Sequence, residues 1–371
     1  MKVLILENSP VGLYKFRGEL VKELLKQHHV SICLPKGRFT GKLRRMGCRY
    51  MECRLLDRHG TNPLQELGLL GYYYKLLRKE KPDVVLTYTI KPNIYGGIAC
   101  SLLGIPYIAN ITGLGTAIGQ GGRMQKLILW LYKKGLAKAW TVFFQNKENL
   151  HFFLQKNMLR GRYRLVPGSG VNLKQHVCTE YPAGECPVIF LTIGRLMRDK
   201  GTDEILQAAG IIKKRYPDVV FRLIGECEEA QYAEKVRRAA EEGTVEYEGF
   251  QPDIRPFIKE SHATIHASWH EGMSNVLLET AAGGRPVIAS DIPGCAEIFT
   301  PGVSGLAFRA KDTDSLVSAI ETFLRMPLQE KARMGKMGRK KAEQEFDRNI
   351  ITAAYLDELQ KLEVKRGKKI R

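Results

Sequence analysis

Paired cysteines, long apolar segments and an export signal are what this 371-residue sequence lacks. Its eight cysteines are scattered without a Cys-x2-Cys pair, so we expect reduced, structural thiols rather than disulfides or metal ligands. The first residues, Met1 to Glu7, become charged too early for the apolar part of a signal peptide and predict a buried strand instead. We therefore expect a protein that stays in the cytosol.

Charged residues are missing between Pro92 and Gly122, which invites comparison with a transmembrane span. Pro106 and several glycines interrupt the run, so it predicts a buried helix at 92–103 and a strand at 106–112. The glycines of 113–119 resemble a dinucleotide-binding fingerprint only superficially, because their last spacing is one residue too long. We expect a loop at a cleft there.

Acidic residues are scarce in the first half of the chain. Residues 1–170 hold 28 Lys and Arg against 9 Asp and Glu, whereas residues 171–371 hold 30 of each, so the net charge of +19 lies entirely in the first half. Nucleic acid, an anionic membrane surface or a lipid-linked pyrophosphate would suit such a charge. No nucleic-acid-binding motif accompanies it, which disfavours the first of these.

The order of apolar segments predicts an α/β protein with two doubly wound parallel sheets. Length and a hydrophobic content of 44% are sufficient for two domains with separate cores. Strand and helix patterns alternate from residue 3 and stop in a polar, proline-containing stretch at 167–187. They resume from Val188 to Phe308, where six strands with intervening helices are predicted. We predict domains at 1–170 and 171–350, with a basic helix and tail at 351–371.

A strand, a loop and a helix are predicted from His262 to Glu279. The short apolar stretch 263–267 is typical of a buried strand, Gly272 ends it, and Ser274 or Asn275 is a suitable helix cap. At about 1.5 Å per helical residue, Glu271 and Glu279 would lie at most about 12 Å apart, the span of a nucleotide-sugar diphosphate. The first backbone N–H groups of the helix would attract the diphosphate.

The histidines at 262, 266 and 270 have the spacing of metal ligands on a helix. Their surroundings predict a strand, in which residues four apart lie about 13 Å from each other, too far for one metal ion. We therefore expect no metal site.

Three motifs in order carry a resemblance to a known family. Glu271 and Glu279 resemble the Glu-x7-Glu signature of retaining family-4 glycosyltransferases, Gly194-Arg195-Leu196 with Lys200-Gly201 resembles their Gly-Arg-Leu-x3-Lys-Gly loop, and 284–294 is similar to the strand and turn that follow. The resemblance implies the GT-B fold, in which two Rossmann-like domains face a cleft and a C-terminal helix crosses back to the first domain.

The resemblance also implies a donor and its binding residues. Arg195 and Lys200 would clamp the pyrophosphate of a nucleotide sugar, most simply a uridine one, Glu279 would hold the ribose, and Glu271 would orient the sugar. No metal or other cofactor is implied, since the two cations and the helix start neutralise the diphosphate. Further donor contacts are expected from Gly194, Gly272, Met273, Ser274 and Asn275, and from Gly12, which is predicted to lie in the turn before a helix that starts near Leu13.

The first half resembles one branch of this family. Lys91-Pro92-Asn93, Tyr14-Lys15-Phe16-Arg17 and the stretch 110–115 are similar to the branch that extends undecaprenyl-diphosphate-bacillosamine with N-acetylgalactosamine, and to related capsule and O-antigen transferases. This implies a polyprenyl-diphosphate-linked acceptor at the inner face of a bacterial membrane, and an N-acetylhexosamine among the candidate sugars. Lys15, Arg17 and Lys91 are the expected ligands of the acceptor diphosphate. No histidine base is expected, because 88–93 lacks the histidine that many relatives carry there.

Two segments are candidates for membrane contact. Residues 123–140 interleave lysines with apolar residues that include Trp130 and Tyr132, and 36–49 mixes arginines and lysines with Phe39, Leu43 and Met46. Ordinary amphipathic helices are the alternative for both, and a solvated helix face is the alternative for Lys15 and Arg17. The competing functions are transfer to a soluble acceptor, a GT-B nucleotide-sugar epimerase and a polyanion-binding protein.

Overall fold

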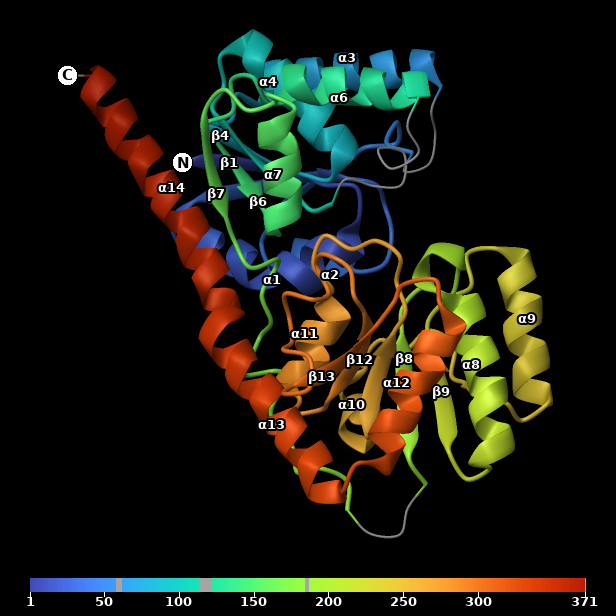
Figure 1. Ribbon diagram of the computed structural model, residues 1–371. Coiled ribbons are helices and arrows are strands. Elements are labelled where there is room, and N and C mark those ends of the chain that lie inside the picture. Colours follow the sequence, from blue (N-terminus) through green and yellow to red (C-terminus); the bar gives the residue numbers. More distant parts are fainter. Residues whose placement is uncertain (58–61, 114–121, 184–186, 371) are drawn as a thin grey trace. The chain divides into compact units, whose positions relative to one another are not determined.

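The computed structural model describes residues 1–57, 62–113, 122–183 and 187–370, which form two compact units (Figure 1). Unit 1 comprises Met1–Ser169 together with Arg348–Arg371, and unit 2 comprises Gly170–Asp347. Each unit contains one parallel sheet with helices on both faces. The predicted α/β class with two parallel sheets is therefore confirmed.

The sheet of unit 1 has seven strands in the order β3-β2-β1-β4-β5-β6-β7. Every neighbouring pair is parallel. The strands are β1 (Lys2–Leu6), β2 (His29–Leu34), β3 (Arg49–Glu52), β4 (Val84–Tyr88), β5 (Tyr107–Ile111), β6 (Thr141–Phe144) and β7 (Arg162–Leu165). The predicted first strand and the predicted strand at 106–112 are confirmed, and the uncharged run before the latter is a π-helix, η1 (Pro92–Gly96), followed by α4 (Gly97–Leu103).

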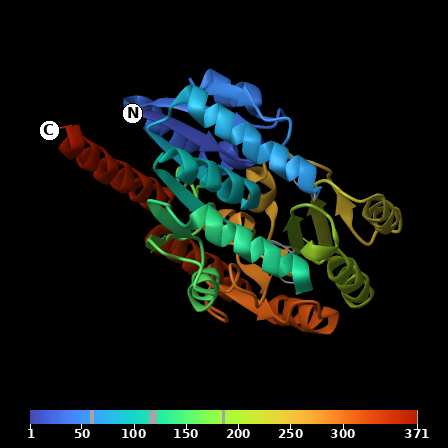
Figure 2. The same cartoon turned by 90° about the horizontal axis from the view of Figure 1, so that it is seen from above.

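Alternate residues of these strands face different helices, as the period of two in a strand requires. Val3 and Ile5 share a core with α1 (Pro10–Gln27) and α2 (Thr40–Arg45), whereas Leu4 and Leu6 face the opposite side. On that side α4 packs between α3 (Pro63–Glu80) and α6 (Gly122–Leu136), and the three helices lie next to one another in Figure 2. A further helix in the described part of this unit is α7 (Lys147–Gln155).

Unit 1 is completed by a segment from the other end of the chain, α14 (Arg348–Ile370). Its apolar side chains belong to the same core as α1 and β1. The ring centroids of Tyr355 and Phe143 lie 4.6 Å apart. The hydroxyl of Tyr355 accepts a hydrogen bond of 2.7 Å from the amide of Asn110. The helix is thus a structural part of unit 1.

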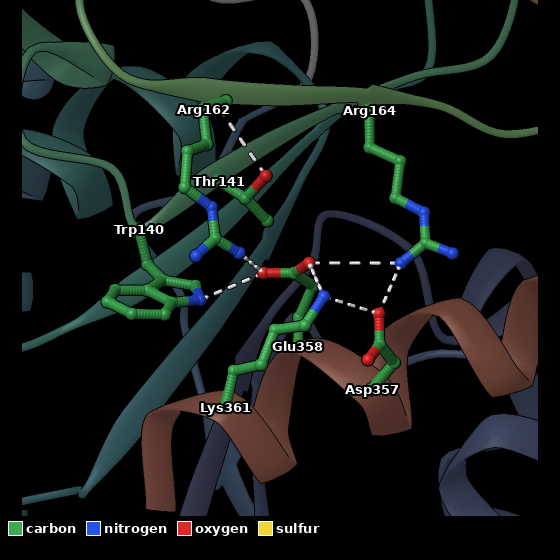
Figure 3. A network of polar contacts seen from close by, with 7 residues as sticks. All are labelled: Trp140, Thr141, Arg162, Arg164, Asp357, Glu358 and Lys361. Carbon is green, nitrogen blue, oxygen red and sulfur yellow. Dashed lines mark hydrogen bonds and ion pairs between the residues drawn. The ribbon is translucent and has the colours of Figure 1, made fainter. Parts of the chain in front are cut away.

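Charged and polar groups fasten α14 to the strands β6 and β7 (Figure 3). The buried carboxylate of Glu358 accepts a hydrogen bond of 2.9 Å from the Trp140 indole and pairs with Arg162. Next to it, Asp357 pairs with Arg164 at 2.7 Å. Lys361, one turn further along the helix, pairs with both carboxylates.

The sheet of unit 2 has six parallel strands in the order β10-β9-β8-β11-β12-β13. They are β8 (Ile189–Ile193), β9 (Val220–Ile224), β10 (Glu246–Tyr247), β11 (Ala263–His266), β12 (Val287–Ser290) and β13 (Gly305–Phe308). One face packs on α8 (Thr202–Arg215), α9 (Ala230–Glu241) and α12 (Thr313–Arg325). The other packs on α10 (Arg255–Glu260), α11 (Asn275–Ala282) and α13 (Leu328–Glu345). The six strands predicted after residue 187 are all present.

Among the described residues, no helix has both the length and the apolar character needed to cross a membrane.

Candidate active site

The strand, loop and helix predicted from His262 to Glu279 are present in unit 2. β11 ends at His266, and Ser274 caps α11 by accepting a hydrogen bond of 3.3 Å from the Leu277 N–H. The helix therefore begins after Glu271, which lies in the loop, and the span of at most about 12 Å between the two glutamates stays a prediction. Glu279 alone is on the helix.

The carboxylate of Glu271 is the centre of a compact polar cluster. Its Oε1 accepts hydrogen bonds of 2.5 Å from Lys200 Nζ and of 3.1 Å from His266 Nε2. Lys200 donates a second hydrogen bond, of 3.2 Å, to the Ser268 hydroxyl. The cluster lies where β8 and β11, neighbours in the sheet, have ended, and ligands of parallel sheets bind at such edges.

The backbone brings Lys200 to this position through a close contact between two loops. η2 (Arg198–Lys200) ends at Gly201, whose φ of 69° lies in the left-handed region. A Cβ atom at Gly201 would come within 2.2 Å of the Ala267 carbonyl oxygen. Only glycine allows both the conformation and this approach, which places Lys200 beside Ser268 and Glu271.

The cluster keeps Glu271 ionised. Burial raises the pKa of the Glu271 carboxyl, but the Lys200 ammonium and the hydrogen bond with His266 outweigh this, and the pKa lies well below its usual range. A carboxylate that is charged throughout the neutral range can accept hydrogen bonds from a ligand but cannot act as a general acid there.

The N-terminal end of α11 differs from the expected row of available N–H groups. The Ser274 N–H donates a hydrogen bond of 2.9 Å to the Gly294 carbonyl, so an anion cannot use it without displacing that bond. Met273 is buried, and the side-chain oxygen of Asn275 is buried without a hydrogen-bond partner among the described residues. Gly272 lies against Gly294, where a Cβ would come within 2.6 Å of the Gly272 carbonyl oxygen.

Arg195 follows β8 directly, after Gly194, as the sequence predicts. Its Nη1 contacts both oxygens of Glu228, at 2.8 and 2.9 Å, and about a third of its side chain is exposed. Glu279 lies 3.8 Å from His176 Nε2, and both side chains are largely buried. Arg195 and Glu279, both predicted to bind the donor, thus each have a partner within the protein.

In unit 1, the predicted donor contact Gly12 lies inside a helix rather than in the turn before it. α1 begins at Pro10, three residues earlier than expected, and the Gly12 N–H donates a hydrogen bond of 3.2 Å to the Ser9 hydroxyl. The ammonium of Lys15 lies 6.0 Å from the Phe39 ring. Arg17 is only 4% exposed and its guanidinium lies 5.1 Å from the Tyr88 ring, so a solvated position for Arg17 is wrong.

Lys91 lies just beyond the end of β4, in a region with unusual backbone geometry. Its ammonium makes an ion pair of 2.6 Å with Glu66, and both side chains are less than a fifth exposed. Thr89 has a φ of 68°, unfavourable for a β-branched residue, and the π-helix η1 follows at Pro92. Such features concentrate at functional sites.

The two segments expected to contact a membrane are only partly suited to it. On α6, Trp130 is 55% exposed and Met124 and Leu127 lie on the same side of the helix, but Tyr132 is fully buried against Phe153 and is wrong as a contact residue. In 36–49, Leu43 is buried, Phe39 and Met46 are partly buried, and the exposed side chains are all basic. The glycine loop of 113–119 lies outside the described residues beyond Gly113.

The sequence alone missed the roles of His266, Ser268 and His176. The spacing of the histidines indicates His266 only as a candidate metal ligand, and the predicted strand that argues against this role is confirmed by β11. The available signal was its position as the last residue of a strand, five residues before Glu271. Within the described residues, no three His, Cys, Asp or Glu side chains are grouped so that they could hold a metal ion.

Two family models match successive parts of the chain. Residues 2–146 match a model described as glycosyl transferase 4-like, and residues 180–341 match one described as glycosyl transferases group 1. A Campylobacter jejuni enzyme named N,N'-diacetylbacillosaminyl-diphospho-undecaprenol alpha-1,3-N-acetylgalactosaminyltransferase is 26% identical, over 96% of this chain and 97% of its own. An Escherichia coli enzyme named UDP-Gal:alpha-D-GlcNAc-diphosphoundecaprenol alpha-1,3-galactosyltransferase is 26% identical over 69% of this chain and 70% of its own.

Solved structures agree with these matches at the level of the fold. An Anabaena protein, HepE, crystallised in complex with UDP and glucose, superposes with a TM-score of 0.79 at 19% identity over 97% of this chain and 99% of that one. Sucrose-phosphate synthase from Thermosynechococcus elongatus superposes with the same TM-score at 18% identity, over 98% of this chain and all of that one. The chain therefore belongs to the group 1, family-4-like glycosyltransferases and has the GT-B fold.

Proposed function

We propose that the protein transfers a sugar, with retention at the anomeric carbon, from a UDP-sugar to a polyprenyl-diphosphate-linked saccharide. The observation that carries the donor side of this proposal is the cluster of Lys200, Glu271 and His266 at the carboxyl edge of the unit 2 sheet. UDP is present in the structure of HepE, and UDP-galactose stands in the name of the Escherichia coli relative. An N-acetylhexosamine is the first sugar to test, given the name of the Campylobacter jejuni relative.

The roles proposed for the residues follow from their chemistry. The Lys200 ammonium has three N–H donors, of which Glu271 and Ser268 take two, so one remains for a phosphate oxygen. Arg195 would exchange Glu228 for the diphosphate, Glu279 would bind the ribose hydroxyls, and Glu271 would accept a hydrogen bond from the sugar. Gly194 and the residues from Gly272 to Asn275 would provide the walls of the donor site in unit 2, and the donor contact expected from Gly12 stays a prediction.

In the reaction, the bond between the anomeric carbon and the diphosphate oxygen breaks, and a bond to the acceptor hydroxyl oxygen forms on the same face of the sugar. The acceptor proton passes to the departing diphosphate, so no protein nucleophile is needed. Arg195 and Lys200 supply the positive charge that stabilises this leaving group. We accordingly propose that turnover needs no divalent metal and persists in excess EDTA.

The acceptor proposal rests on unit 1. Its basic character, the strained backbone at Thr89 and the partly exposed pair of Lys91 and Glu66 support an anionic ligand near the end of β4. Both relatives named above act on undecaprenol-diphosphate-linked sugars, according to their names. Lys15, Arg17 and Lys91 are the proposed ligands of that diphosphate, and the proposed location is the inner face of a bacterial membrane.

The test is UDP release from a panel of UDP-sugars, measured with and without polyprenyl-diphosphate-linked saccharides and with soluble sugars. We expect release that requires the lipid-linked acceptor, and at least a hundredfold loss of turnover in Glu271→Ala and Arg195→Ala, measured at a temperature at which circular dichroism shows both variants to be folded. Release with a soluble acceptor alone would overturn the lipid-linked acceptor but not the donor site. Full activity in both variants would overturn the assignment of the donor site.

A further inference from the structure

His266 has a buried side chain that hydrogen-bonds to residues of the proposed donor site. It is 7% exposed, it is the last residue of β11, and its Nε2 lies 3.1 Å from Glu271 Oε1 and 3.1 Å from Ser274 Oγ. These are its hydrogen-bond contacts among the described residues.

The neighbours determine where the histidine carries its proton. Glu271 is ionised and can only accept, and Ser274 Oγ already accepts from the Leu277 N–H. A lone pair on Nε2 would face the negative carboxylate oxygen at 3.1 Å, which is repulsive. We therefore assign the proton to Nε2, so that His266 donates to Glu271.

This hydrogen bond fixes the orientation of the Glu271 carboxylate. Oε1 is held from two sides, by His266 and by Lys200, while Oε2 has no hydrogen-bond partner in the part of the chain that the structure describes. Lys200 alone would not fix the orientation of the carboxylate, because its ammonium is a point charge on a flexible side chain and can approach either oxygen. The imidazole is rigid and buried, so its N–H selects Oε1 and leaves Oε2 for a ligand.

We propose that His266 is a positioning residue that holds Glu271 so that Oε2 accepts a hydrogen bond from a hydroxyl group of the donor sugar. The inference rests on the proposed function and adds a residue to it. His266 itself does not contact the substrate. Its loss should therefore affect turnover of the nucleotide sugar and leave binding of the free nucleoside diphosphate unchanged.

Two substitutions at His266 separate the hydrogen bond from the packing. His266→Gln can place an amide N–H where Nε2 lies, whereas His266→Leu keeps similar bulk without a donor. We expect His266→Leu to lower kcat with the UDP-sugar by about 10- to 100-fold, the loss typical when the partner that orients a ligating side chain is removed. His266→Gln should stay within about fivefold of the wild type, and UDP affinity measured by calorimetry should change less than about twofold in both.

His262 provides the matched control. It is also a buried histidine beside β11, but its Nδ1 accepts a hydrogen bond of 3.1 Å from the Ile189 N–H. His262→Leu should lower the unfolding midpoint and leave kcat unchanged. If His266→Leu does not fold, His266→Asn replaces it, since its amide reaches only the Nδ1 position.

The proposal is overturned if His266→Gln loses as much activity as the variant without the donor, or if UDP affinity falls in parallel with kcat. It is also overturned if His262→Leu lowers kcat as much as His266→Leu does. If the wild type releases UDP and His266→Leu releases it at the same rate, this inference alone is overturned. A wild-type protein that releases no nucleoside diphosphate from any donor overturns the proposed function, and this inference with it.

Discussion

Glu271 retains its charge in a largely buried position because neighbours replace the water that it loses. A carboxyl whose pKa is lowered on folding stabilises the protein above its unfolded pKa of about 4.5, and this contribution is lost as the pH falls below that value. The cluster therefore contributes fully to stability at neutral pH. Its charge also stays constant there, so a pH dependence of turnover near pH 7 has to come from other groups.

A second residue, His262, gives a pH dependence of the stability of unit 2. Burial, together with the charges of Lys331 and Arg285, lowers the pKa of His262 to about 4. The unfolded chain binds a proton near pH 6.5 and the folded chain does not, so folding loses stability as the pH falls from 7 to 5, by about 1 to 2 kcal/mol. His262→Leu should have a lower free energy of unfolding than the wild type at pH 7, but this free energy should fall less on acidification.

Urea unfolding of both proteins at pH 7, 6 and 5 measures this difference. If the free energy of unfolding falls equally with pH in the wild type and in His262→Leu, the pKa of His262 does not differ between the folded and unfolded states, and the prediction is wrong.

At the scale of elements, the attachment of α14 depends on one buried carboxylate. Glu358 is 3% exposed, accepts a hydrogen bond from Trp140 and makes ion pairs with Arg162 and Lys361. Glu358→Ala removes the acceptor common to all of them and should reduce the free energy of unfolding of unit 1 by about 2 to 4 kcal/mol. Circular dichroism during urea unfolding measures the change.

The neighbouring Asp357 is the control for this prediction. It also pairs with an arginine of β7 and with Lys361, but its side chain is 42% exposed, and exposed ion pairs contribute little. Asp357→Ala should leave the unfolding midpoint almost unchanged. Equal losses in the two variants would contradict the importance of burial in this network (Figure 3).

The elements of unit 2 were predictable because their sequence signals are local. Short apolar strands bounded by glycines predicted all six strands, and Ser274 predicted the start of α11. α1 starts earlier than the position near Leu13 that the sequence pattern predicts, because Pro10 suits the first turn of a helix and lies within it. The burial of Tyr132 differs from the prediction because α6 is apolar on most of its circumference, so the sequence alone does not tell which aromatic ring faces the core.

The site was predictable only in part, for a related physical reason. Motif spacing identified Glu271, Lys200 and Arg195, but the partners of these groups come from positions distant in sequence. Ser268 reaches Lys200 through the contact of Gly201 with Ala267, and Glu228 reaches Arg195 from the loop after β9. Such pairings arise from the packing of separate loops, which no short sequence pattern contains.

At the scale of the whole molecule, the charge is divided more unevenly than the sequence halves suggest. Because α14 belongs to unit 1, that unit holds 35 Lys and Arg against 12 Asp and Glu, a net charge of +23, and unit 2 holds 23 against 27, a net charge of −4. An anionic bilayer attracts such a surface at short range, and salt weakens the attraction. On α6, Met124, Leu127 and Trp130 add exposed apolar area beside lysines.

We expect the protein to sediment with vesicles that contain phosphatidylglycerol, not with vesicles of phosphatidylcholine alone, and to be released between about 0.1 and 0.5 M salt. Leu127→Ser should weaken this binding about threefold to tenfold, because roughly half of a leucine side chain is available for burial. The matched control is Leu328→Ser, at a leucine of unit 2 that is 45% exposed. Equal weakening by both substitutions, or binding that ignores lipid charge, would contradict a membrane surface on α6.

The position of α14 has a consequence for the order of events during synthesis. Domains usually fold as they leave the ribosome, starting with the N-terminal one. Here the core of unit 1 needs Ile351, Tyr355 and Leu359, which are made only after all of Gly170–Asp347. Unit 2 is continuous and can fold first, so the earlier part of the chain waits, with apolar surface uncovered, for the later part. Chaperone binding to ribosome-bound chains should therefore persist until α14 emerges.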